Sequence, residues 1–200
     1  MSYLREFPGA NMQDIWFGAN LETPPLYFEI ARLTYRCKSQ LTHKDREMMG
    51  GFSMSLLNCP EPQGVHTRNF TFAGGERWLI PDLVRDPTFM SVEEKYRPLL
   101  VLIRKSLERA DSVNKADVDA CYDAGWNGHT VQIVSALTAF SSQLALWINM
   151  LGMRYDEEEI IESSNNITTG GYGENDGPCL TDEQYKEKYP DYLDTNFKIS

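Results

Sequence analysis

The feature that most constrains the fold is a long stretch without charged side chains, His129–Met153. As a helix, this stretch is long enough to cross a hydrocarbon core of about 30 Å. Its apolar character is nevertheless interrupted by six polar residues: Gln132, Ser135, Ser141, Ser142, Gln143 and Asn149. That mixture is typical of a helix buried at the centre of a helical domain or at a subunit interface. We therefore expect no membrane span and no membrane partner.

Negative charge is concentrated at the C-terminal end of the 200-residue chain, whose formal net charge is −10. Residues 156–200 hold twelve acidic and three basic side chains, and the rest of the chain is nearly neutral. An acidic surface repels phosphate backbones, so nucleic acid is excluded as a partner. Because the acidic segment is rich in Glu, Asn, Gly and Thr, it can bury little apolar surface on its own. We expect an irregular C-terminal extension over 155–200, either loose or laid against a partner surface.

The four cysteines lie far apart in the sequence, at Cys37, Cys59, Cys121 and Cys179. The opening run MSYLREFPGANMQDIW lacks the charged-then-apolar pattern of an export signal. Reduced thiols in a cytoplasmic protein are therefore expected. No glycine-rich phosphate loop precedes a helix, so no nucleotide cofactor is expected.

Helical periodicity and helix-capping residues dominate the first half of the chain. Apolar residues recur at three- and four-residue steps over Leu26–Gln40. Thr42 followed by Asp45 is a capping-box pattern that predicts the start of the next helix. Pro60 and Pro62 are tolerated only near a helix start, because proline lacks the backbone donor needed further in. The segment between these helices is therefore predicted to be a short loop, with Asn58 available as a cap.

Capping patterns continue after a Gly- and Pro-punctuated stretch over residues 74–87. They mark helix starts at Ser91 with Glu94, at Asn114 with Asp117, and at Asn127. Gly152 then ends the long uncharged helix. Since no segment alternates as a strand would, we predict an all-α domain over 26–154, preceded by an N-terminal arm over 1–25.

Three reactive side chains fall in the predicted helix–loop–helix: Glu47, Cys59 and His66. Cys59 and His66 are seven residues apart, nearly two helical turns, so we expect them to point the same way. A cysteine at a helix N-terminus feels the positive end of the dipole, which favours the thiolate. Glu47, on the preceding helix, is placed to orient the imidazole. Structural explanations also fit: a small buried thiol, a core histidine and a solvated Glu.

The run LTHKDREMMGGFSMSLLNCPEPQGVH resembles the core motif of the carboxymuconolactone decarboxylase and alkylhydroperoxidase-D-like superfamily. Members carry a Glu twelve residues before a C-x-x-C, and a His four residues after its second Cys. Glu47, Cys59 and His66 fall on that spacing. The downstream stretch over residues 97–153, with its "ADV…AGW" turn before the long helix, is similar to the peroxidase-related branch. The resemblance implies an alkylhydroperoxidase-D-like helical bundle that forms homo-oligomers: dimers, trimers or hexamers.

The chain departs from the family at Pro62, where redox-active members have the cysteine that attacks peroxide. The usual dithiol cycle cannot run without that thiol. Cys59 occupies the place of the resolving partner, and Glu47 with His66 matches the proton-relay positions. The resemblance therefore implies the fold together with a degenerate redox site.

Three functions remain open, with Glu47, Cys59 and His66 as the candidate catalytic residues. The first is an antioxidant, one-cysteine, peroxidase-like oxidoreductase, in which Cys59 is oxidised by a small hydroperoxide and reduced by an external thiol. The second is a cofactor-free, decarboxylase-like acid–base enzyme. There Glu47 and His66 shuttle protons on a small carboxylate or lactone, with Arg46 or Arg68 as a possible anion clamp.

The third function is a non-catalytic binding or assembly subunit, whose tyrosine-rich tail orders against a neighbouring subunit. The tyrosines concerned are Tyr172, Tyr185, Tyr189 and Tyr192. A metal site built from Glu47, Cys59 and His66 is the weakest alternative, because no spaced ligand pair reinforces these three residues. We expect no metal.

Overall fold

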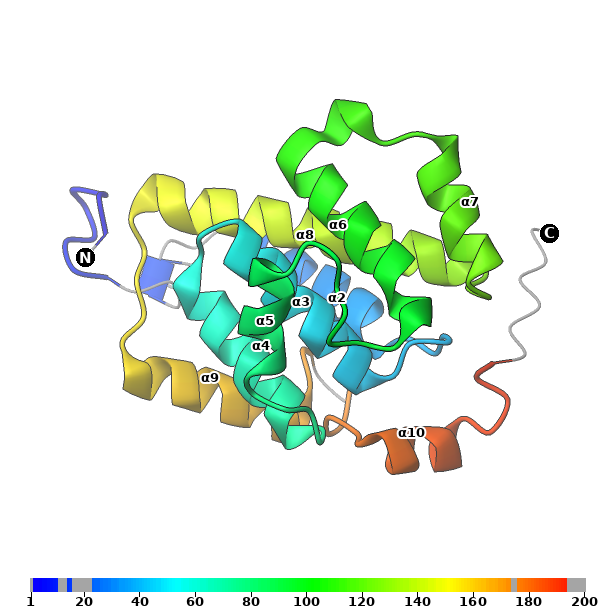
Figure 1. Cartoon of the computed structure of the whole chain (residues 1–200). Coiled ribbons are helices and arrows are strands. Elements are labelled where there is room, and N and C mark those ends of the chain that lie inside the picture. The colour runs from blue at the N-terminus through cyan, green and yellow to red at the C-terminus, as the bar shows by residue number, and fades with distance from the viewer. Residues whose placement is uncertain (1, 11–13, 16–22, 174–175, 194–200) are drawn as a thin grey trace.

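The computed structural model describes residues 2–10, 14–15, 23–173 and 176–193. Every regular element in these segments is helical (Figure 1), which confirms the predicted all-α class. The longer helices are α2 (Thr23–Arg36), α3 (His43–Leu56), α4 (Pro60–Phe72), α5 (Leu79–Arg85), α6 (Arg97–Arg109), α7 (Lys115–Asp123), α8 (Gly128–Leu151), α9 (Glu157–Gly170) and α10 (Asp182–Lys188). Two short 3-10 turns, Glu94–Tyr96 and Ala110–Ser112, flank α6.

The helices α3 and α4 form a hairpin around which the others are arranged (Figure 1). α8 packs against α2, α3 and α6, and α9 packs against α4. The predicted N-terminal arm is described only in part, because 11–13 and 16–22 lie outside the described residues. In the part that is described, the Tyr3 amide donates to the Leu151 carbonyl at the end of α8, at 2.8 Å.

The predicted helix caps at four positions are confirmed. Thr42 with Asp45 and Asn114 with Asp117 form capping boxes at the starts of α3 and α7. The Asn127 side chain accepts from the Thr130 amide at the start of α8. Gly152 ends α8 in the left-handed region at φ 63°, which glycine adopts without steric cost.

Two predicted caps are wrong. Ser91 and Glu94 do not start α6, because Glu94 lies in the 3-10 turn Glu94–Tyr96 and α6 begins at Arg97, with Tyr96 at the N-cap. In the turn before Ser91, the Asp86 carboxylate accepts from the Thr88 and Met90 amides. Asn58 does not cap α4 either. Its backbone is left-handed at φ 51°, and the N-cap position falls on Cys59.

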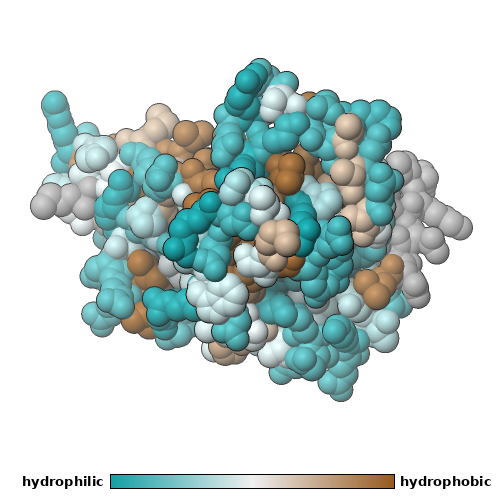
Figure 2. Space-filling model, in the orientation of Figure 1, coloured by the Kyte–Doolittle hydropathy of each residue, from teal (hydrophilic) through white to brown (hydrophobic). Residues whose placement is uncertain are grey.

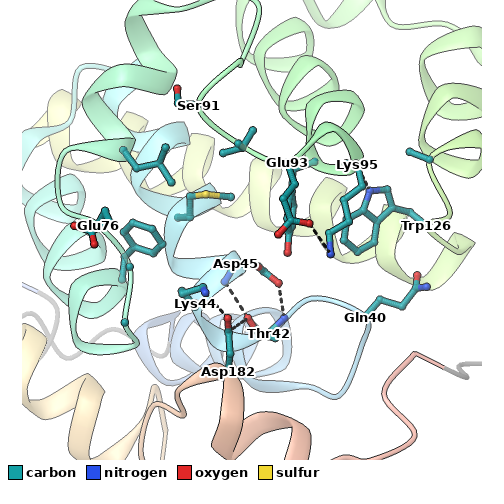
Figure 3. Close-up of a pocket in the computed structure, with 18 of the residues that line it drawn as sticks. Gln40, Thr42, Lys44, Asp45, Glu76, Ser91, Glu93, Lys95, Trp126 and Asp182 are labelled. Carbon is teal, nitrogen blue, oxygen red and sulfur yellow. Dashed lines mark hydrogen bonds and ion pairs between the residues drawn. The ribbon is translucent and has the colours of Figure 1, made fainter.

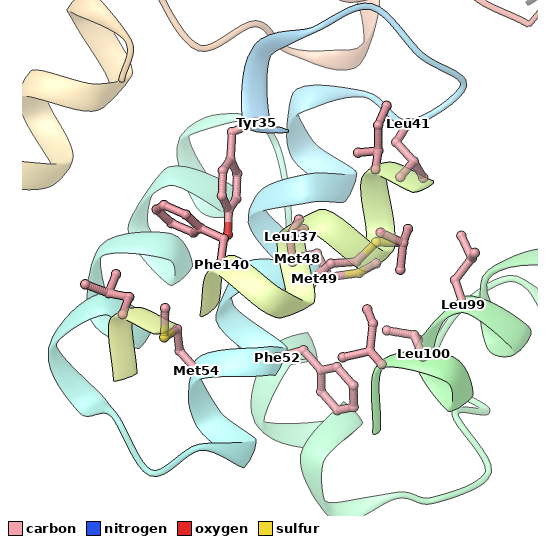
Figure 4. Packing of buried hydrophobic residues seen from close by; sticks show 14 of the residues in the cluster. Tyr35, Leu41, Met48, Met49, Phe52, Met54, Leu99, Leu100, Leu137 and Phe140 are labelled. Carbon is pink, nitrogen blue, oxygen red and sulfur yellow. The ribbon is translucent and has the colours of Figure 1, made fainter. Parts of the chain in front are cut away.

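The hydrophobic core lies between α3, α6 and α8 (Figure 4). Met49 and Phe52 of α3 are fully buried, as are Leu99 and Leu100 of α6 and Leu137 of α8. α8 has the length and composition of a membrane-spanning helix. One side of it is nevertheless buried within the bundle, as predicted for a central helix.

The exposed face of α2 differs from a simple amphipathic pattern. The recurring residues Leu26, Ile30 and Leu33 are 65%, 46% and 51% exposed. The buried side of the helix carries Tyr27, Ala31, Thr34, Tyr35 and Arg36 instead. The periodicity therefore identified the helix but not the side that faces the core, because buried polar and aromatic residues occupy the inner face.

The prediction of an irregular C-terminal extension is wrong over α9 and α10. Both helices have capping boxes, at Asp156 with Glu159 and at Thr181 with Gln184. The extension also packs on its own chain. The Tyr185 hydroxyl donates to the Ser39 carbonyl and accepts from the Ser39 amide, both at 3.0 Å. Low apolar content did not prevent folding, because neighbouring helices supply the missing core.

We expect Tyr185→Phe to lower the free energy of unfolding by about 1–3 kcal/mol, because the buried Ser39 amide loses its acceptor. Chemical denaturation followed by circular dichroism measures this change. Tyr122→Phe is the matched control, because Tyr122 is half exposed. Equal stability of the two variants would show that α10 is not docked in this way.

Candidate active site

The site is organised around the Glu47 carboxylate, which is fully buried on α3. Arg36 of α2 donates to its Oε1 at 3.0 Å, and Asn69 of α4 donates to its Oε2 at 3.2 Å. His66 Nδ1 lies 2.8 Å from Oε2. The Tyr172 hydroxyl, from the segment after α9, lies 3.2 Å from both oxygens. Four donors from three different parts of the chain therefore surround one carboxylate.

These donors keep Glu47 ionised. Burial by itself raises the pKa of Glu47, but the Arg36 charge and the His66 hydrogen bond outweigh it and hold the pKa below its ordinary value. Burial and the neighbouring Glu47 charge raise the pKa of Tyr172 well above its usual range, so Tyr172 stays a donor. The Arg36 guanidinium also lies 4.7 Å from the centre of the Tyr172 ring, in cation–π geometry.

His66 is held in a defined orientation. Because a carboxylate only accepts, the contact with Glu47 assigns the ring proton to Nδ1. Tyr35 stacks on the imidazole with ring centroids 5.0 Å apart, and its hydroxyl lies 3.4 Å from Nε2. Gly50 makes this approach possible. A Cβ at Gly50 would lie 2.6 Å from the Tyr35 hydroxyl and 3.0 Å from His66 Nδ1.

A small apolar cavity of about 70 Å³ adjoins the imidazole. It has room for about five water-sized groups. Pro62 lines it one helical turn before His66, at the position where the resemblance places a peroxidatic cysteine. The other lining residues are Tyr27, Phe28, Ala31, Val65, Phe140, Leu144, Tyr155, Ser163, Ile167 and Tyr172.

The structure does not bring Cys59 to this site. Cys59 is the N-cap of α4, with φ −116° and ψ 85°, so the helical spacing used to align it with His66 does not apply. No hydrogen bond joins it to Glu47 or His66 within the described residues, and Cys59 borders a different hollow, with Met54 and Pro81. Burial and the nearby Glu61 raise the pKa of the Cys59 thiol to about 12, against the expected thiolate.

Neither proposed anion clamp reaches the cavity. Arg46 is fully buried and donates to the Cys37 carbonyl and the Ser39 hydroxyl, so it fixes the chain after α2. Arg68 is exposed and lines a hollow beside α9. The three residues Glu47, Cys59 and His66 do not form a metal-binding group, and no group of three or more His, Cys, Asp or Glu in the described ranges is arranged to hold an ion.

A larger cavity, of about 470 Å³, lies between α3, the loop before α6, and α10 (Figure 3). Its charged groups are largely paired with one another: Lys44 with Asp182, and Lys95 with Glu93. Asp45, also in its wall, belongs to the α3 capping box. Since Glu47 and His66 do not line it, we place the candidate active site at the small cavity.

Comparisons with known proteins identify the fold. No protein-family model matches the sequence, and no curated protein is detectably similar to it. Among the solved structures that are similar to this chain, two each have a TM-score of 0.62. One is an uncharacterized peroxidase-related protein from Silicibacter sp. TM1040, 18% identical over 68% of this chain and 71% of that chain. The other is the alkylhydroperoxidase AhpD core of an uncharacterized peroxidase-related protein from Ralstonia eutropha JMP134, 19% identical over 70% and 73%.

The chain has the alkylhydroperoxidase-D-like fold. At these identities the similarity shows the fold alone, so the chemistry must be argued from the site. The structure brings together Glu47 and His66, as the sequence predicted, but the sequence did not indicate that Arg36, Asn69 and Tyr172 contact Glu47. No local sequence pattern marks these three residues, because each contacts Glu47 only when the helices are packed together.

We expect Gly50→Ala to displace Tyr35 and His66, even though alanine favours a helix over glycine by about 1 kcal/mol. Nitrogen NMR of the imidazole should show the Nδ1-protonated form lost or mixed. Gly170→Ala is the matched control, since a Cβ there meets nothing within 4 Å. An unchanged His66 spectrum in Gly50→Ala would contradict the assigned geometry.

Proposed function

We propose that this chain is a cofactor-free acid–base enzyme that moves protons on a small carbonyl compound, through His66 oriented by Glu47. The observation that carries the proposal is the 2.8 Å contact between Glu47 and His66 Nδ1, next to a cavity that His66 itself lines. The fold supports a peroxidase-related ancestry, and the cavity chemistry favours proton transfer. The apolar lining and the volume of about 70 Å³ favour a substrate the size of a five-membered lactone.

The proton-transfer step uses Nε2, the unprotonated nitrogen of the imidazole. With Nδ1–H donated to Glu47, the Nε2 lone pair takes a proton from a carbon next to a carbonyl. The imidazolium so formed is stabilised by the ionised Glu47, and Nε2 then returns the proton to another carbon. The Tyr35 hydroxyl, 3.4 Å from Nε2, is positioned to hydrogen-bond that nitrogen between turnovers.

The one-cysteine peroxidase is the second candidate, and the Cys59 thiol argues against it. Burial and the nearby Glu61 raise the pKa of this thiol to about 12, so the thiol form is favoured over the thiolate at neutral pH. The thiolate is the form that attacks peroxide, and among the described residues no hydrogen bond joins Cys59 to His66, the imidazole expected to take its proton. Proton transfer at His66 requires no change in the ionisation of Cys59.

The test uses isomerisation of the unsubstituted β,γ-butenolide to its conjugated isomer, followed by ultraviolet absorbance. This reaction moves one proton between two carbons and needs no co-reactant. We expect acceleration by the wild type, at least a hundredfold loss in His66→Gln and Glu47→Gln, and less than a twofold change in Cys59→Ser. His129→Gln is the matched control histidine.

Hydroperoxide consumption with excess small thiol is measured in parallel on the same proteins. Turnover of hydroperoxide by the wild type that Cys59→Ser abolishes would overturn the proposal in favour of the one-cysteine peroxidase. Inertness of the wild type in both assays would overturn it in favour of a binding or assembly subunit.

We also propose that the chain forms a homo-oligomer in the cytoplasm. Large apolar side chains are exposed on two packed helices, α2 with Leu26 and Leu33, and α8 with Leu146 and Met150. The four cysteines are free, as expected in a reducing compartment. Size-exclusion chromatography with light scattering should give a multiple of 22.9 kDa, and Leu33→Lys with Met150→Lys should lower it. A wild-type monomer would exclude the oligomer.

A further inference from the structure

The hollow beside α9 that Arg68 lines has a volume of about 800 Å³ and lies between α4, α5 and α9, apart from the His66 cavity. Its volume is in the range of small-molecule sites, about 300–1,000 Å³. Neither Glu47 nor His66 lines it. Its lining residues come from α4, the start of α5 and α9. The face of the molecule shown in Figure 2 is mostly hydrophilic, with separate hydrophobic patches.

The charge of this hollow is opposite to that of the protein. Two arginines line it, Arg68 on α4 and Arg77 before α5, and of the described residues that line it only Glu157 is acidic. Both arginines are exposed, and within the described residues neither has a carboxylate partner. Most other arginines differ in this respect, because five of them form ion pairs with carboxylates: Arg32, Arg36, Arg85, Arg109 and Arg154.

Exposed aromatic side chains lie in the wall of the same hollow. Phe72 and Trp78 are each 54% exposed. The opposite wall is formed by Ile160 and Ile161 of α9, which are half-buried. Large apolar side chains beside unpaired guanidinium groups match a ligand that has a flat apolar body and an anionic end.

We propose that this hollow binds a small aromatic carboxylate. The Arg68 and Arg77 guanidinium groups hold the carboxylate, since a guanidinium donates two parallel hydrogen bonds to such a group. Trp78 and Phe72 pack against the ring. The net charge of −10 excludes a general attraction of anions to this protein, so the affinity comes from the local pair of arginines.

The wall of the hollow is also connected to the candidate active site. Ser164 lines the hollow and donates to Asn69 Oδ1 at 2.7 Å. Asn69 in turn donates to Glu47. A ligand that fixes α9 against α4 therefore holds in place the helix that carries both Asn69 and His66, and it stabilises the folded state by mass action.

Calorimetric titration with 1-naphthoate tests the proposal on the full chain. We expect saturable binding that weakens with added NaCl, at least tenfold weaker binding in Arg68→Gln/Arg77→Gln, and at least tenfold weaker binding of the neutral 1-naphthamide. Arg109→Gln/Lys115→Gln is the matched control. It removes the same charge from exposed positions elsewhere and should bind within about twofold of the wild type.

Three results would overturn the proposal: no saturable binding by the wild type, equal binding of naphthamide, or equal losses in the two double variants. Indole N–H resonances in the NMR spectrum test separately where the ligand binds. Naphthoate should shift one indole N–H resonance, and Trp78→Phe should remove that resonance. A shift of other indole resonances alone would place the ligand elsewhere. None of these measurements depends on turnover at His66.

Discussion

The buried negative charge of Glu47 is the constraint on which the rest of the structure depends. An isolated carboxylate in a protein interior is strongly unfavourable unless donors replace its water. Here the donors are Arg36, His66, Asn69 and Tyr172, and they come from α2, α4 and the segment after α9. All of these elements must pack on α3 before the charge is satisfied. The site and the arrangement of the bundle are therefore consequences of one another.

This requirement explains how an acidic, polar extension becomes ordered. Tyr172 brings the extension to Glu47, and burial of its ring against Tyr35 supplies apolar contact. Beyond it, Asp182 pairs with Lys44. The Tyr185 hydroxyl accepts from the backbone amide of Ser39 and donates to its carbonyl. The remaining acidic side chains of α9 and α10 stay largely exposed. The extension thus needs few apolar residues of its own, because its anchoring groups enter a core that the domain has already formed.

Most of the domain could be predicted from the sequence, since caps and helix stops act within four residues. The boxes at Thr42 and Asn114 and the stop at Gly152 are of this kind. Cys59 was misplaced because a side chain at an N-cap does not follow the helical angle. Tyr172 was expected to order against a neighbouring subunit, whereas it contacts Glu47 of its own chain; 125 residues separate the two, and such a pairing has no local signature.

Helix α4 presents different chemistry on its two sides, and α9 packs against it. Pro62 and His66 line the small apolar cavity, whereas Arg68 lines the larger hollow beside α9, where guanidinium groups lie next to apolar side chains. On the cavity side, Pro62 lies one helical turn before His66, whose Nδ1 is 2.8 Å from the Glu47 carboxylate. The hydrogen-bonded chain from Ser164 through Asn69 to Glu47 runs between these two sides. A change in how α9 sits on α4 must therefore alter the donors around Glu47, and with them the orientation of the imidazole.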